Sequence, residues 1–554
     1  MIAIRANTVG LSSGISAVNT GLRRASGPAW VPDPNRWMFG GTRLGLNNST
    51  HNGTFVAGTG APTTFITAGF ESQASKVKIA LPAYPVTHLR FVFCNWRRSI
   101  SGNTPIEVTP GHALTINDFF VHIAGTAFQV QFSGSGTGTI PDGESFITDA
   151  LDITSLSAAQ RTGALADLCT LSTVPLGGTR MCQGVDRVMH LLGEGIQHAA
   201  TPAALAGLCA ANTITGQGAS GNVFPLAPVA VLCRGWDGRP TVLITGDSIF
   251  WGQNYSSSNT YFGHDARFSR GMAAVALDST TGPGRLPYAN FAVPGVNSTQ
   301  SDALADHPRT FGVIDAARAL NAGNALPFTC FFGNMGTNDF GSAVQATIYP
   351  TPFLTNLDAH INAWRTRYPG PKWIHTTLWP RTNTNPAQGA PGPNGAWGST
   401  AAQMPVNTDA TTGNGRWLFN AALVAGTTGL NIDGVINTAP VVQDATFPDR
   451  WKTGPRSGTF SASYASASLT FQSATAFEVG DSVSVDNAGT IINRIVTART
   501  GSGPFTHTLT TSFGANLAAG TAIVTRLTDD GVHPWVTGHL ACAEVIDANK
   551  HLFT

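Results

Sequence analysis

A serine that directly follows an apolar run is the residue of this chain most suited to nucleophilic chemistry. Residues 241–245 form the run, and Gly246, Asp247 and Ser248 come after it. A serine just past the carboxyl end of a strand, with a helix starting behind it, has an exposed hydroxyl and nearby backbone N–H groups that can bind an oxyanion. We therefore expect Ser248 to be a nucleophile and Asp247 to satisfy loop N–H groups around it.

The same three letters occur again at Gly480, Asp481 and Ser482. Here they lie inside residues 477–485, where apolar and polar residues alternate. This alternation predicts a strand at an exposed edge or in a sandwich, with no helix behind it. We expect Ser482 to be structural, so the surroundings of the triplet decide its meaning.

A histidine near the C-terminus could serve as the base for Ser248. A serine hydroxyl needs a group that removes its proton, and a neutral imidazole suits that task near pH 7. His533 is the candidate, and Asp530 precedes it by three residues. The Asp530 carboxylate could accept from the other ring N–H and hold the tautomer. Asp529 is adjacent and could compete for that role.

Two further blocks stand between the serine and the histidine. One apolar run ends at Gly295, and another leads into Gly336, Thr337, Asn338 and Asp339. In order, the blocks G-D-S, a lone Gly, G-x-N-D and D-x-x-H resemble the SGNH (GDSL-type) hydrolase family. The resemblance covers residues 238–453 and 527–554, and it implies a flavodoxin-like, three-layer α/β core around a parallel sheet.

The resemblance also implies roles for single residues. Ser248 would attack an acyl ester, His533 would act as base and then acid, and Asp530 would orient the histidine. The oxyanion hole would consist of the backbone N–H groups of Ser248 and Gly295 and the side-chain amide of Asn338. No metal or organic cofactor is needed for this chemistry.

Three more side chains are candidates for substrate contact. Trp251 follows Ser248 closely and could line the acyl or sugar site, with packing against the following helix as the alternative. Trp379 and Arg381 follow the strand-like residues 373–378, at the strand end where ligands bind in open α/β sheets.

The chain is too long for one compact core, because 554 residues exceed the usual size of a single domain. A helix is expected between 352 and 368, where apolar residues recur every three or four positions. The small β domain expected at residues 454–527 returns to the core beside the catalytic loop, so we expect it near the mouth of the site. The expected divisions are an arm or attachment segment (1–80), a β-sandwich or jelly-roll-like domain (81–152), a connector (153–236), the first part of the hydrolase core (237–453), an inserted small β domain (454–527) and the C-terminal part of the core (528–554).

Composition narrows the classes of partner. The net formal charge is +1, only 11% of residues are charged, and no basic stripe is visible, which argues against nucleic acid and anionic membranes. No apolar run reaches the length of a bilayer span, and we expect no signal peptide, because residues 1–8 lack a basic segment followed by an apolar core. The seven cysteines include no C-x-x-C pair, so neither a zinc site nor a dense disulfide framework is indicated.

Together these features favour a serine esterase that removes O-acetyl groups from a polysaccharide, such as host capsule or O-antigen. A β-rich chain with five lysines and no export signal resembles virion proteins of tailed bacteriophages. We therefore expect a virion-associated or extracellular location, with further copies of the chain or other virion proteins bound through the N-terminal region. The alternatives are a non-catalytic glycan-binding spike or fibre, and a lipase or thioesterase acting on small acyl esters.

Overall fold

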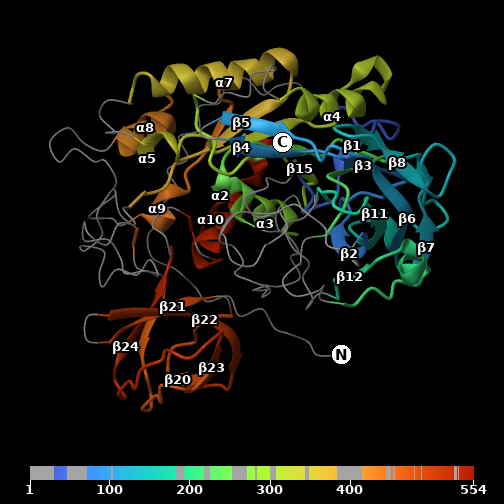
Figure 1. The fold of residues 1–554 in the computed structure, drawn as a ribbon. Coiled ribbons are helices and arrows are strands. Elements are labelled where there is room, and N and C mark those ends of the chain that lie inside the picture. The colour runs from blue at the N-terminus through green and yellow to red at the C-terminus, as the bar shows by residue number, and fades with distance from the viewer. Residues whose placement is uncertain are drawn as a thin grey trace.

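Three regions make up the described part of the protein: a β-sandwich, an α/β region with a parallel sheet, and a small β unit (Figure 1). The structure is a computed structural model. It describes residues 30–46, 71–101, 104–181, 193–216, 225–252, 271–280, 284–299, 307–342, 349–382, 415–443, 451–452, 456–479, 481–487, 490–528, 533–534 and 536–554.

The parallel sheet has five short, buried strands in the order β15-β14-β16-β17-β18. Counted along the chain this order is 2-1-3-4-5, the arrangement of a doubly wound sheet whose ligands bind where the order reverses, beside β14. The prediction of an α/β region with a parallel sheet is confirmed. The strands are β14 (Val242–Ile244), β15 (Tyr288–Asn290), β16 (Cys330–Gly333), β17 (Lys372–Thr376) and β18 (Gly434–Ile436).

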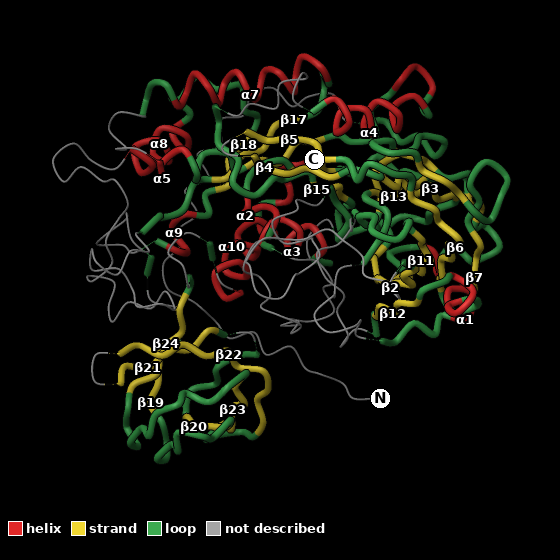
Figure 2. The backbone as a smooth tube through the Cα atoms, in the orientation of Figure 1, coloured by secondary structure: helices red, strands yellow, loops and turns green. Residues whose placement is uncertain are grey.

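Helices cover both faces of this sheet, as Figure 2 shows. Leu243 of β14 packs with one group of helices, whereas Val242 and Ile244 pack with the other, because alternate strand residues face opposite sides. The expected helix between 352 and 368 is confirmed as α7. The first group comprises α4 (Pro308–Ala319), α7 (Phe353–Arg367) and α8 (Gly415–Ala425); the second comprises α2 (Ser248–Trp251), α3 (Met272–Asp278), α9 (Ala439–Val442) and α10 (Val536–Ala548).

The β-sandwich consists of two antiparallel sheets that enclose one apolar core. The inner sheet has the order β1-β13-β3-β10, with β9 also paired to β3. The outer sheet has the order β12-β2-β11-β6-β7, with β8 also paired to β6. Their strands are β1 (Met38–Gly40), β3 (His88–Cys94), β9 (Ser145–Ile147), β10 (Leu151–Asp152) and β13 (Ala230–Cys233), then β2 (Ser72–Ala80), β6 (Leu114–Ile123), β7 (Thr126–Gln129), β8 (Gly138–Ile140), β11 (Leu165–Thr173) and β12 (Gly195–Ala199).

The sandwich extends beyond the predicted limits of 81–152 at both ends. Its strands β1 and β2 come from the predicted arm, and β11, β12 and β13 come from the predicted connector. Polar residues on the core-facing side of β2 interrupt the alternation of apolar and polar residues that would mark it as a strand in the sequence. Ser75 donates its hydroxyl to the carbonyl of Leu226 at 2.7 Å, and the side chain of Gln73 accepts from the Leu226 N–H at 3.0 Å.

The inner sheet packs directly on the α/β region. Phe39, Val92 and Leu232 share one apolar cluster with Leu243 of the parallel sheet. The backbone that follows β1 also runs along β15, where the Leu46 N–H donates to the carbonyl of Asn290 at 2.9 Å. This segment covers an edge that would otherwise present unpaired backbone groups.

A hairpin of β4 (Arg97–Ser101) and β5 (Thr104–Val108) reaches from the sandwich to α4. The carboxylate of Glu107 accepts from the backbone N–H groups of Arg309 and Thr310, at 2.9 and 2.7 Å, in the first turn of α4. A carboxylate there satisfies donors that have no partner within the helix.

The small β unit forms one six-stranded antiparallel path around its own apolar cluster. Its strands lie within the predicted limits of 454–527. The side chain of Asp481 ties the unit to α10, because it accepts from the Thr537 hydroxyl at 3.0 Å. The strands are β19 (Ser457–Thr459), β20 (Thr470–Ser473), β21 (Ser482–Asn487), β22 (Thr490–Thr500), β23 (Phe505–Leu509) and β24 (Ala522–Arg526).

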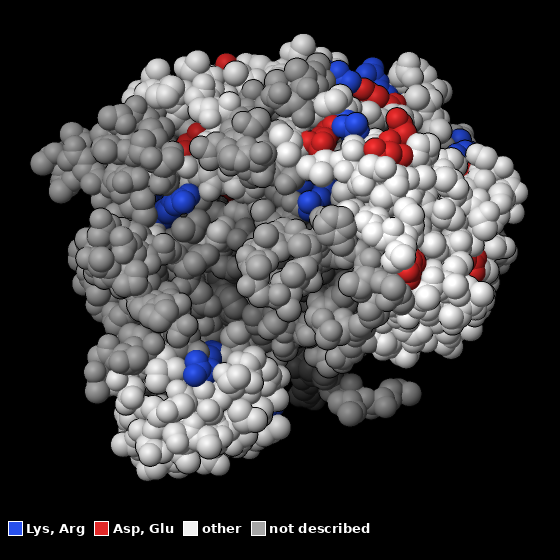
Figure 3. Space-filling view, viewed as in Figure 1, with Lys and Arg blue, Asp and Glu red and all other residues white. Residues whose placement is uncertain are grey.

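The remaining short helices are α1 (Leu208–Ala211) on the outer sheet and α5 (Asp339–Ser342) after β16. On the face shown in Figure 3, Lys and Arg side chains are scattered and form no stripe. None of the helices within the described ranges combines the length and the apolar character that crossing a bilayer requires.

Candidate active site

Ser248 is the first residue of α2, immediately after the turn that ends β14. Asp247 is the N-cap, and its Oδ1 accepts from the N–H of Ile249 at 2.9 Å. Gly246 has φ of 137°, and a Cβ there would lie 2.0 Å from Oδ1 of Asn334. The turn therefore requires glycine, and the local sequence suits a serine held at the tip of a strand.

Asp247 and Asn334 join the ends of two neighbouring strands, β14 and β16. The Asn334 amide donates to Oδ1 of Asp247 at 2.9 Å, and the Asp247 N–H donates to Oδ1 of Asn334 at 3.2 Å. Burial raises the pKa of Asp247, while the Ile249 N–H and the Asn334 amide oppose that rise. The expected structural role of Asp247 agrees with these contacts.

Ser248 and His533 meet although 285 positions separate them. Oγ of Ser248 lies 2.8 Å from Nε2 of His533, within the reach that proton transfer needs. The serine is 4% exposed, and the histidine is half-buried. The hydroxyl of Thr528, at the end of the small β unit, donates to the carbonyl of His533 at 2.7 Å and joins His533 to that unit.

The predicted partners of His533 lie outside the described residues. Asp530 and the competing Asp529 both fall in the gap between Thr528 and His533. The role of Asp530 in orienting the imidazole therefore stays a prediction.

The predicted oxyanion donors follow the carboxyl ends of three adjacent strands. Ser248 follows β14, Gly295 follows β15 and Asn338 follows β16. The Asn338 amide donates to the carbonyl of Val296 at 2.8 Å, and this contact joins the loops after β16 and β15. The loop after β15 is also joined to the serine turn, because the Val293 N–H donates to the carbonyl of Gly246 at 2.8 Å.

Asp339 adds a second link between the same two loops. Its carboxylate accepts from the N–H of Ser298 at 3.0 and 3.1 Å and from the Ser298 hydroxyl. Burial raises the pKa of Asp339 to about 6, and the Ser298 donors oppose the rise. In the sequence Asp339 stands out only as the last residue of the G-x-N-D block, and nothing there indicates Ser298 as its partner.

Arg381 contacts one of the predicted oxyanion donors. Its Nη1 donates to Oδ1 of Asn338 at 3.2 Å and to the carbonyl of Thr337 at 3.3 Å. The guanidinium thereby fixes which end of the Asn338 amide is the oxygen, since only an oxygen can accept from it. The prediction placed Arg381 in contact with substrate, and the structure gives it a contact with Asn338.

The two tryptophans predicted to contact substrate lie in the core. Trp379 is 2% exposed, and its ring N–H donates to the hydroxyl of Thr438 at 3.0 Å. Trp251 is 6% exposed and belongs to the apolar cluster that contains α3. For Trp251 this is the packing that the sequence offered as the alternative. Burial leaves both rings little surface for a ligand, so we expect them to act through packing.

The described residues contain no group of three His, Cys, Asp or Glu side chains arranged to hold a metal ion. Within those ranges the site brings together a hydroxyl, an imidazole and candidate amide donors at one edge of a parallel sheet. This set can carry out nucleophilic attack on a carbonyl with general-base assistance.

No family model matches the chain, and a search of curated proteins gives no significant match. Solved structures to which the chain is similar include a possible lipase from Chitinophaga pinensis, at 16% identity and a TM-score of 0.30, covering 56% of this chain and 98% of that one. A family two carbohydrate esterase from Clostridium thermocellum has 12% identity and a TM-score of 0.22, covering 67% and 83%. A carbohydrate acetylesterase from Sinorhizobium meliloti has 21% identity and a TM-score of 0.18, covering 27% and 69%. At such values these likenesses carry no weight for function, which has to be inferred from the side chains at the site.

Proposed function

We propose that this protein is a serine esterase of the SGNH (GDSL) type. The observation that carries the proposal is the 2.8 Å contact between Ser248 Oγ and His533 Nε2, at the point where the strand order of the parallel sheet reverses. The links among the turns after β14, β15 and β16 support it further, because they hold three candidate donors at one edge of the sheet.

In the proposed reaction, Nε2 of His533 takes the proton of Ser248 as Oγ bonds to the ester carbonyl carbon. The charge that develops on the carbonyl oxygen is stabilised by the backbone N–H groups of Ser248 and Gly295 and by the Asn338 amide. The tetrahedral intermediate then breaks its bond to the alcohol oxygen, which receives the proton from His533. Water repeats the attack on the acyl-serine, with Asp530 orienting the imidazole throughout.

We propose an O-acetylated polysaccharide as the substrate. Two β-rich regions adjoin the α/β region, and the small β unit is joined to it beside His533 through Thr528 and through the contact of Asp481 with Thr537. An extended glycan can contact these two β-rich regions over more of its length than a small ester can. A virion or extracellular setting, with capsule or O-antigen as the glycan, belongs to the same proposal.

Hydrolysis of p-nitrophenyl acetate and p-nitrophenyl octanoate tests the chemistry, with acetate release from an acetylated bacterial polysaccharide in parallel. We expect the acetyl ester and the polysaccharide to be hydrolysed by the wild type and not by Ser248→Ala. A preference for octanoate would indicate a lipase or thioesterase. A folded wild type that hydrolyses none of the three would indicate a glycan-binding spike.

A further inference from the structure

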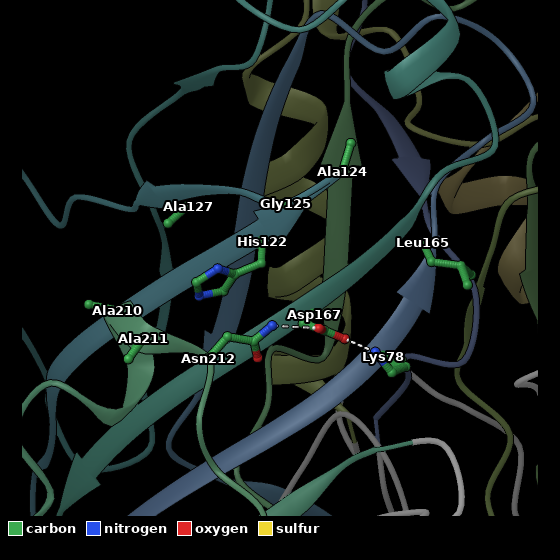
Figure 4. A pocket seen from close by; sticks show the side chains of 10 residues that line it. All are labelled: Lys78, His122, Ala124, Gly125, Ala127, Leu165, Asp167, Ala210, Ala211 and Asn212. Atoms are coloured by element: carbon green, nitrogen blue, oxygen red, sulfur yellow. Dashed lines mark hydrogen bonds and ion pairs between the residues drawn. The ribbon is translucent and has the colours of Figure 1, made fainter.

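The outer sheet of the sandwich carries a cavity of about 340 Å³ on the face away from the sandwich core. Residues from β2, β6, β11 and α1 line it (Figure 4). Those with polar side chains are Lys78, His122, Asp167 and Asn212.

The register of the sheet places three of these side chains in one row. Lys78 of β2 is the partner of Asp167 of β11, which is the partner of His122 of β6. The row continues to Ala127 of β7. Directly paired residues of neighbouring strands share one face, so the row crosses four strands side by side.

Hydrogen bonds hold the row in a defined arrangement. Asp167 pairs with the ammonium of Lys78, and its other oxygen accepts from the Asn212 amide at 2.8 Å. Nε2 of His122 lies 2.8 Å from the carbonyl of Cys209. A carbonyl only accepts, so Nε2 carries the hydrogen and Nδ1 is left as an acceptor.

The chemistry of the lining indicates the class of ligand. Lys78 and Asp167 form an ion pair in the lining, and the nearby ammonium of Lys76 donates to the carbonyl of Asn212 at 3.3 Å, so each of these charged groups already has a polar partner. An ammonium has three protons and a carboxylate about four acceptor positions, more than the contacts above use, so the lining retains both donor and acceptor capacity for a ligand. Leu165, at 44% exposed, and five small residues at positions 124, 125, 127, 210 and 211 add an apolar wall.

We propose that this cavity binds a pyranose unit of a glycan. Hydroxyl groups both donate and accept, as Lys78, Asp167 and Nδ1 of His122 require together. The C–H face of a sugar ring matches the exposed Leu165 and the alanine methyl groups. A neutral, hydroxyl-rich ring therefore fits better than a phosphate or a simple cation.

The cavity is separate from the candidate active site. The inner sheet, with Val92 and Leu232, packs on the α/β region, while the cavity lies on the far face of the outer sheet. Sugar binding there does not rest on the chemistry of Ser248. If the esterase proposal also holds, the cavity would keep a polysaccharide near the enzyme and raise its effective concentration at Ser248.

Saturation-transfer NMR with the full chain tests the proposal, using methyl glucopyranoside, methyl galactopyranoside, methyl mannopyranoside and N-acetylglucosamine as probes. We expect at least one to bind, and Asp167→Ala and His122→Ala each to weaken that binding about tenfold or more. Thr139→Ala is the matched control, because its partner Thr115 places it on the same sheet outside the cavity. Thermal unfolding of each variant checks that the sandwich remains folded.

The outcomes separate this proposal from the esterase. Wild type and all three variants are expected to hydrolyse p-nitrophenyl acetate equally, so loss of sugar binding with unchanged hydrolysis supports the cavity. Sugar binding without any hydrolysis would leave the cavity standing and overturn the esterase. Binding of none of the probes, or binding that survives both cavity substitutions, would overturn the sugar site. Displacement of the sugar by inorganic phosphate would reassign the cavity to an anion.

Discussion

The protein contains the letters Gly-Asp-Ser twice, and the two serines stand in opposite surroundings. Ser248 ends a turn between a parallel strand and a helix, with its hydroxyl 2.8 Å from an imidazole nitrogen. Ser482 opens β21, where Ile495 and Arg526 on neighbouring strands flank it. The expectation that Ser482 is structural agrees with this place inside a sheet. The comparison shows that strand topology, and not the triplet, places one serine beside an imidazole and the other inside a sheet.

The two aspartates of the triplets differ as well. Asp247 is fully buried with an amide and a backbone N–H as donors, and it shapes the serine turn. Asp481 is also buried, but both its oxygens lie 3.0 Å from Nη1 of Arg456 and one accepts from Thr537. Asp247 therefore acts at the serine turn, whereas Asp481, which also accepts from the Glu478 N–H at 2.8 Å, joins the small β unit to α10.

The largest effect is expected from exchanging the two serines for alanine. Ser248→Ala should lower hydrolysis of p-nitrophenyl acetate by about a thousandfold or more, because the nucleophile is lost. Ser482→Ala should leave the rate within about twofold of the wild type, since no step uses its hydroxyl. Equal losses in both variants would show that the two triplets had been wrongly distinguished.

Asn338→Ala should have the next largest effect. Loss of one oxyanion donor costs about a hundredfold to a thousandfold in kcat, with little change in KM. Asn362→Ala is the matched control, because its amide donates to Asp358 within α7 at 2.8 Å. A change in KM with unaltered kcat would instead mean that Asn338 contributes ground-state binding.

The serine turn could be predicted because its signals are local. An apolar strand, a glycine in a demanding turn and a capping aspartate follow one another between 241 and 248. The short distance from Ser248 to His533 needed the family pattern, because the two lie 285 positions apart.

The extent of the sandwich could not be predicted, for a physical reason. Gln73 and Ser75 face its interior, and both form hydrogen bonds with the backbone of Leu226. This partner lies 153 positions from Gln73 and 151 positions from Ser75. A periodicity argument counts such residues as solvent-facing. The contacts of Asp339 with Ser298 and of Arg381 with Asn338 were missed likewise, because each joins two loops that only the fold brings together.

Arg381→Met should lower kcat about tenfold, an effect smaller than loss of Asn338 itself. The guanidinium orients the Asn338 amide, so its loss lets the amide rotate without removing the donor. KM for p-nitrophenyl acetate should change little. Arg318→Met in α4, another half-buried arginine, serves as control. A raised KM for the polysaccharide with unchanged kcat would favour the substrate contact predicted from the sequence.

Asp339→Asn should lower kcat only severalfold, since an amide oxygen can still accept from Ser298. The clearer effect of this substitution is on how the stability of the protein depends on pH. The folded carboxyl has a pKa of about 6 against an ordinary 3.8, so between these values the folded protein binds more protons than the unfolded chain. The wild type should therefore lose stability relative to Asp339→Asn as pH rises from about 4 to about 6, and the difference should then stay constant. Melting temperatures across this range would refute the assignment if the difference had the opposite slope.

The smallest effect on hydrolysis is expected from Asp481→Asn, the counterpart of Asp247 in the second triplet. The amide oxygen of the variant can still accept from Thr537, but the ion pair with Arg456 is lost. The small β unit should therefore lose about 1–3 kcal/mol of stability. Below its melting temperature the variant should hydrolyse p-nitrophenyl acetate at the wild-type rate, whereas Asp247→Asn should slow it by disturbing the turn of Ser248. A lower rate of hydrolysis in Asp481→Asn while the small β unit is still folded would mean that the contact with Thr537 positions His533 through α10. In that case both triplets would act on the same site.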